Sequence, residues 1–113
     1  MMHEGAATVP RDRIDAVHSI LADGERRSII RTLSAAGTPM SVSTLVDRVA
    51  EDRDEMPVRV RLYHQHLPKM DDAEIVEYDR DAGRVVLTST GRRADAVATR
   101  TTELLGGDPL FSE

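Results

Sequence analysis

The chain has 113 residues, which is enough for one domain with a modest hydrophobic core. It contains no cysteine, which excludes disulfides and thiol chemistry, and no run of roughly 18 apolar residues that would predict a membrane span. Residues 1–10 lack the basic start and apolar block of a signal peptide, so we expect a cytoplasmic protein without a membrane partner.

The charged residues are biased in both sign and kind. The formal net charge is −5, and the basic residues are 14 arginines and one lysine, Lys69. Carboxylates hold water and ions at a surface, whereas lysine stems add apolar area, so this composition predicts a protein of a halophilic organism. An acidic mesophile with a GC-rich genome is the alternative. Acidity does not exclude DNA binding, because a groove-facing patch needs only local positive potential.

The first half of the chain predicts three helices. The first is expected from Asp12, and Asp23 is placed to cap the second, which Gly37 ends. Residues 38–40 suggest a short extended connector. Ser41 is a good N-cap for the third helix, whose apolar residues follow at helical spacing.

A fourth helix is predicted over residues 57–70, after a charged loop. Pro68 lacks an N–H group and clashes one turn back, so we expect a kink or a tightened last turn there. Residues three and four apart share a helix face. The inner face is then formed by Leu62, Tyr63, His66, Leu67 and Met70. The outer face has no carboxylate and is formed by Arg61, His64, Gln65 and Lys69.

The second half continues with a β-hairpin over residues 75–88, because two β-prone runs flank a loop that contains Gly83. A terminal helix over residues 90–105, opened by Thr88 or Thr90, follows. Two apolar strips, one on the first helix and one on this last helix, are expected to join two copies of the chain. They consist of Ile14, Val17, Leu21, Ala94, Val97, Ala98, Thr101, Leu104 and Leu105.

Four segments resemble prokaryotic repressors of the broad ArsR, PadR and MarR class. Residues 21–33 (LADGERRSIIRTL) look like the opening helix of that class, residues 66–76 (HLPKMDDAEIV) like the entry to the wing, and residues 87–92 (LTSTGR) like the segment after it. Residues 62–70 (LYHQHLPKM) look closest to small haloarchaeal winged-helix proteins.

The resemblance implies a fold that is mainly α with a small β-wing (α+β), namely a winged helix-turn-helix with an additional N-terminal and C-terminal helix. The expected domain spans residues 12–105, between flexible tails at 1–11 and 106–113. Glu74 departs from the broad class, which usually has glycine there, so we expect the turn into the wing to be strained or built differently.

The predicted DNA contacts lie on the fourth helix and the wing. Arginine, lysine, histidine and glutamine suit phosphates and base edges. The residues are Arg59, Arg61, His64, Gln65, Lys69, Arg80 and Arg84. For Arg80 and Arg84, pairing with Asp79 and Asp81 is an equal alternative.

Metal binding and catalysis are not expected. His64 and His66 are two residues apart, so on a helix they point to nearly opposite sides and cannot readily chelate one ion. We expect His66 to face the core and bond to backbone. No glycine-rich phosphate loop or nucleophile elbow is present, so we predict neither an enzyme nor a cofactor.

The sequence therefore predicts a homodimeric, sequence-specific, DNA-binding transcriptional regulator of a halophilic archaeon. Helix 57–70 would enter the major groove, and the wing at residues 75–88 would touch the backbone or minor groove of double-stranded DNA, with salt ions bound at that interface. The alternative is a winged-helix adaptor that binds protein through its acidic surface and does not bind DNA.

Overall fold

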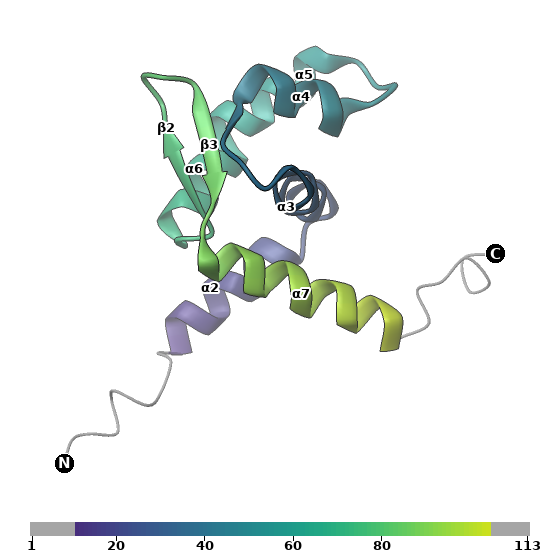
Figure 1. The fold of residues 1–113 in the computed structure, drawn as a ribbon, viewed down its shortest axis with the longest axis vertical. Coiled ribbons are helices and arrows are strands. Elements are labelled where there is room, and N and C mark those ends of the chain that lie inside the picture. Colours follow the sequence, from purple (N-terminus) through teal and green to yellow (C-terminus); the bar gives the residue numbers. More distant parts are fainter. Residues whose placement is uncertain (1–10, 105–113) are drawn as a thin grey trace.

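The computed structural model describes residues 11–104 and is mainly helical, with one small antiparallel sheet (Figure 1). This confirms the α+β class. The elements in chain order are α2 (Arg11–Leu21), α3 (Gly24–Ala36), β1 (Met40–Ser41), α4 (Val42–Ala50), α5 (Glu55–Arg61), the π-helical turn η1 (Leu62–His66), α6 (Leu67–Asp72), β2 (Val76–Asp79), β3 (Arg84–Leu87) and α7 (Ser89–Leu104).

Local capping explains where the early helices start and stop. The Asp23 carboxylate accepts hydrogen bonds from the backbone N–H groups of Glu25 and Arg26, which α3 cannot satisfy internally. Gly37 ends α3 in the left-handed conformation at φ 70°, and Ser41 caps α4 by accepting from the Thr44 N–H. All three predicted caps are confirmed.

The sheet has three strands in the order β1-β3-β2. The hairpin pairs Val76 with Leu87, and its loop contains Gly83 at φ 65°, as predicted. The expected connector before the third helix is in part a strand, because Met40 pairs with Val85. A strand of two residues leaves no period in the sequence, so its pairing could not be predicted.

α3 occupies the centre of the molecule, with the hairpin on one side, α4 and α5 on another, and α2 and α7 beneath it (Figure 1). The apolar residues that recur at helical spacing in α3 and α4 are buried: Ile29, Ile30, Leu33, Val42, Leu45, Val46 and Val49. On α2, Ile20 is fully buried, whereas Ile14, a residue of the predicted dimer strip, is 43% exposed.

The fourth helix is longer than predicted and contains a widened turn. It begins at Glu55 with Asp54 as its cap, and runs through η1 to Asp72. Of the two disturbances expected at Pro68, a kink or a tightened turn, the tightened turn is not found. The backbone widens instead, and the Leu67 N–H donates to the Leu62 carbonyl five residues earlier. Widening one turn relieves the clash between the proline ring and the preceding turn.

The junction between α6, the hairpin and α7 is tightly built. Glu74 turns the chain into β2 at φ 63°, a conformation that glycine adopts without strain, so the expected strain is present. The Thr88 hydroxyl caps α7 by accepting from the Gly91 N–H. A Cβ on Gly91 would lie 2.3 Å from the Ile75 carbonyl oxygen, so α7 lies against the base of the hairpin only because this residue has no side chain.

Candidate nucleic-acid interface

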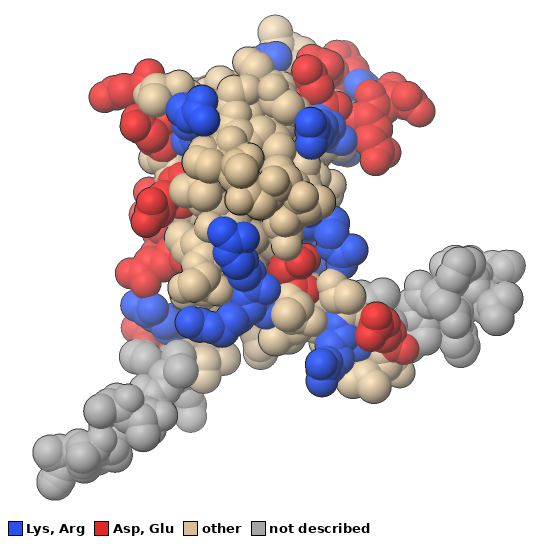
Figure 2. Space-filling view, viewed as in Figure 1, with Lys and Arg blue, Asp and Glu red and all other residues tan. Residues whose placement is uncertain are grey.

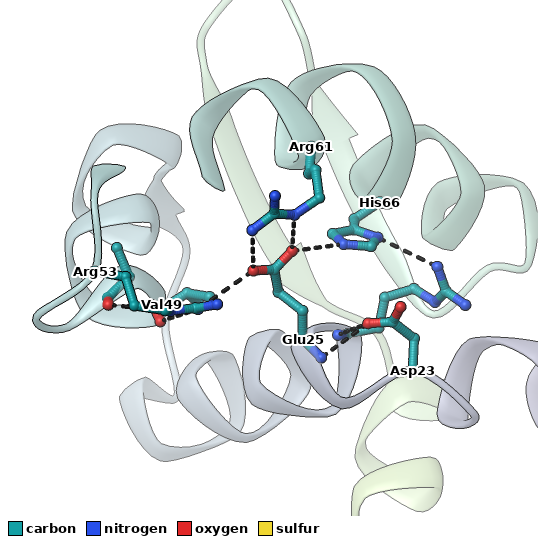
Figure 3. A network of polar contacts seen from close by, with 8 residues as sticks. Asp23, Glu25, Val49, Arg53, Arg61 and His66 are labelled. Carbon is teal, nitrogen blue, oxygen red and sulfur yellow. Dashed lines mark hydrogen bonds and ion pairs between the residues drawn. The ribbon is translucent and has the colours of Figure 1, made fainter. Parts of the chain in front are cut away.

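A buried carboxylate, Glu25, organises the fourth helix from below (Figure 3). Both of its oxygens accept from the Arg61 guanidinium, at 2.7 Å from Nε and 2.9 Å from the second nitrogen. Arg53 approaches the same carboxylate at 3.3 Å, and the Glu25 side chain is only 10% exposed. The bidentate hydrogen bond from Arg61 is the largest influence on Glu25 and, against the effect of burial, lowers its pKa to about 2.

His66 completes this cluster from the next turn of the helix. Its Nε2 lies 2.9 Å from a Glu25 oxygen, and its Nδ1 lies 3.2 Å from a guanidinium nitrogen of Arg26. A guanidinium can only donate, so Nδ1 accepts and Nε2 carries the proton that bonds Glu25. The prediction that His66 faces the core is confirmed, but its partners are side chains and not backbone.

Arg26 is buried and also donates to the carbonyls of Ser19 and Ile20, at the end of α2. One guanidinium therefore joins α2, α3 and the π turn. Glu25 and Arg26 were visible in the sequence only as a helix start. Glu25 is 36 positions from Arg61, and Arg26 is 40 positions from His66. No local sequence pattern could therefore reveal these contacts.

The outer face of the fourth helix differs from the predicted one in one residue. His64, Gln65 and Lys69 are exposed as predicted. Arg61 is not on their side, because its guanidinium turns inward to Glu25. In an uninterrupted α-helix Arg61 would lie one turn below Gln65, whereas the extra residue in η1 moves it sideways.

Two apolar side chains take part in the outer face instead. Met56 is 63% exposed and Val60 is 51% exposed, both on the first half of the helix. Neither was among the predicted contact residues, because the π turn that aligns them with the polar half is not visible in the sequence. Arg59 is about one-third exposed and lies 3.8 Å from Glu55, so it is partly engaged by its own helix.

The hairpin presents its two arginines in different surroundings. The Arg80 guanidinium lies 5.8 Å from the centre of the Tyr78 ring, a cation–π distance. Arg84 is exposed on β3 and borders a shallow groove that also contains Asp71, Glu77 and Asp79. Among the described residues no ion pair forms between either arginine and Asp79 or Asp81.

The charged side chains of the molecule are grouped. Figure 2 shows acidic side chains along two edges of the face in view, which has the hairpin and α7 in front, with basic groups in separate patches and a broad uncharged area between. Near the start of α5, the neighbouring carboxyl group of Asp47 raises the pKa of Glu55. The basic side chains in view are therefore confined to patches on a chain whose overall charge is −5.

The predicted dimer strips meet in an apolar groove between α2 and α7 of about 330 Å³. Ile14, Val17 and Leu21 line one wall and Ala94 and Val97 the other. Val97 is 57% exposed and Leu104 is 78% exposed, whereas Ala94 is buried within the protein. Ala98 is half-buried beside α3, Thr101 is exposed, and Leu105 lies outside the described residues.

Within residues 11–104 no group of three histidines, cysteines or carboxylates is close enough to hold a metal ion. Over the same residues, no helix is both long and apolar enough to cross a membrane.

Comparison with known families matches residues 18–86 to a domain of unknown function, DUF7344. The chain belongs to the DUF7344 family. The matched segment starts within α2 and ends within β3, so it contains the Glu25 cluster, the fourth helix and most of the hairpin. No curated protein and no solved structure matches the chain.

Proposed function

We propose that this DUF7344 protein is a winged helix-turn-helix transcriptional regulator that binds double-stranded DNA as a homodimer. The observation that supports it most is the outer face of the fourth helix, where His64, Gln65 and Lys69 are exposed beside a two-stranded hairpin that carries Arg80 and Arg84. A helix with an adjacent hairpin can place the first in a major groove and the second on the backbone or minor groove.

The order of elements supports the same proposal. α4 and the helix that starts with α5 form a helix-turn-helix pair, and β1, β2 and β3 provide the wing. The Glu25 cluster fixes the second helix of this pair to α3, so its outer side chains are held on a rigid element, as a reading surface requires.

The dimer follows from the α2–α7 groove. Val97 lies in the exposed stripe on α7, and Leu104 lies two turns further along it. If two α7 helices pack antiparallel about a twofold axis, Leu104 of each copy faces Val97 of the other, where the groove is open. Two reading helices would then meet successive major grooves about 34 Å apart.

A protein-binding adaptor is the second candidate. Two features favour it. The acidic residues before α5 repel phosphate and suit a basic protein surface, and the exposed Met56 suits an apolar one.

The test is a mobility-shift assay with pooled genomic duplex DNA in about 1–2 M KCl, comparing the wild type with the double variant Gln65→Ala, Lys69→Glu. The wild type should retard DNA and the variant should not. Arg92→Glu, on the exposed side of α7 away from the groove, provides the matched charge control and should bind as the wild type does. Absence of any retarded band with the wild type would leave the adaptor as the better function.

A further inference from the structure

The π turn decides which residues of the fourth helix share its outer side. The Leu67 N–H donates to the Leu62 carbonyl, so the turn contains one residue more than an α-helical turn. Positions five apart are therefore aligned across it. Leu62 and Leu67, the two residues joined by this hydrogen bond, are both fully buried on the inner side.

The same offset aligns Val60 with Gln65 on the outer side. Met56 lies one α-helical turn before Val60, and Lys69 lies one turn after Gln65. All four are exposed, and no carboxylate occurs between positions 56 and 70. The result is one continuous stripe, apolar in its first half and polar in its second.

We infer that this stripe of Met56, Val60, Gln65 and Lys69 reads A·T base pairs in the major groove through the thymine methyl and the adenine edge. The inference rests on the proposed DNA binding and specifies its sequence preference. The thymine 5-methyl is the apolar group that the major groove presents, and a glutamine amide can bond adenine N6 and N7 together.

The dimensions of the stripe fit this assignment. Val60 and Gln65 are separated by about 7 Å along the helix axis at ~1.5 Å per residue. That corresponds to roughly two base-pair steps of about 3.4 Å. A thymine read by Val60 should therefore lie about two steps from an adenine read by Gln65, and Lys69 lies one turn further on, where it reaches a phosphate or a guanine.

The acidic residues bound the contact without interrupting it. Asp54 and Glu55 precede the stripe, and Asp71 and Asp72 follow it. Met56 lies next to Asp54 and Glu55, whose carboxylates repel DNA. Val60 and Gln65 lie in the middle of the stripe, so we expect them to make the closest base contacts. Arg61 is held by Glu25, so we expect it to position the fourth helix and not to select a base pair.

The experiment starts from a random duplex library selected on the full-length protein in about 1–2 M KCl. In the selected duplex, each thymine is replaced in turn by deoxyuridine, which lacks only the methyl group, and each adenine by 7-deazaadenine, which lacks the N7 acceptor. We expect a three- to tenfold loss of affinity at one deoxyuridine position, and a comparable loss at a deazaadenine about two steps away.

The variants assign these losses to residues. Val60→Ala should bind the thymine and deoxyuridine duplexes equally, and Gln65→Ala should become insensitive to the deazaadenine, as in a double-mutant cycle. Arg92→Ala, which removes an exposed side chain from α7 away from the groove, is the control and should keep full discrimination. Circular dichroism of each variant shows whether a change in binding reflects a lost base contact or unfolding.

Two negative outcomes have different meanings. If the library yields no bound duplex, DNA binding itself is refuted and the inference with it. If a duplex is bound but no deoxyuridine weakens it, and Val60→Ala selects the same sequence as the wild type, the inference is overturned while the regulator function stands.

Discussion

Replacing Glu25 with glutamine removes the charge that holds Arg61, Arg53 and His66 around one carboxylate. The pKa of Glu25 falls from 4.5 to about 2, since Arg61 and then His66 bond its ionised form. A shift of about 2.5 units corresponds to an upper value of ~3.4 kcal/mol at ~1.36 kcal/mol per unit. Arg61 and Arg53 are 40% and 55% exposed, so water screens part of the attraction, and we expect a loss of about 2 kcal/mol at pH 7.

The pH dependence has a definite sign. Because the folded-state pKa is lowered, the ionised carboxylate contributes its full stability above pH 4.5, and this contribution is lost as the pH falls towards about 2. Glutamine cannot titrate. The difference in unfolding free energy between wild type and Glu25→Gln should therefore shrink from about 2 kcal/mol at pH 7 to less than about 1 kcal/mol near pH 2.5.

Urea unfolding followed by circular dichroism, at the lowest KCl concentration that keeps both proteins folded, measures this difference at each pH. Glu77→Gln, which removes an exposed carboxylate from β2, is the matched control and should change stability by less than about 0.5 kcal/mol at pH 7. A Glu25→Gln effect of the same size at pH 7 and pH 2.5 would refute the electrostatic reasoning. It would then be shape or packing that makes Glu25 important.

Three further predictions concern other parts of the molecule. The double variant Val97→Asp, Leu104→Asp should be monomeric by light scattering at micromolar concentration, because it places carboxylates in the proposed dimer contact; a wild type that is itself monomeric would contradict the dimer. Glu74→Gly should raise the unfolding free energy by about 1 kcal/mol in urea, because glycine adopts the φ of 63° without strain. The exposed ion pair of Glu74 with Arg13 offsets little of this gain, so an unchanged or lower stability would show that the pair matters more than the strain. DNA affinity can be measured from roughly 0.5 to 3 M KCl. The slope of log affinity against log salt concentration should be much shallower than about −0.9 per phosphate contact, since counterion release contributes little at molar salt. A steep negative slope would contradict both the short-range binding and the halophilic origin.

Most of the fold could be predicted because its signals are local. Asp23 and Ser41 bond backbone groups two or three positions away, and Gly37 and Gly83 adopt the positive φ that the sequence pattern required. The sequence did not predict the strand at Met40. This strand depends on pairing with Val85, 45 positions later, and a strand of two residues has no recognisable period.

The candidate site was less predictable, for the same physical reason. Helical spacing correctly separated buried Leu62 and Met70 from exposed Gln65 and Lys69. It assigned Arg61 to the wrong side, because ideal spacing assumes that every turn has the same number of residues. Pro68 indicated a disturbance, but whether the turn tightens or widens depends on contacts made by His66 with α3, far away in the sequence.

The absence of a side chain at Gly91 has a mechanical consequence. α7 extends from this contact as a lever, and Leu104 lies thirteen residues further along, about 20 Å from the pivot. A methyl group at this position would push the start of α7 away from the Ile75 carbonyl, and any tilt that results would move the far end of the helix more than its start. If α7 joins two copies, even alanine at this position would change the separation of the two reading helices, and with it the spacing of the half-sites that the dimer can span.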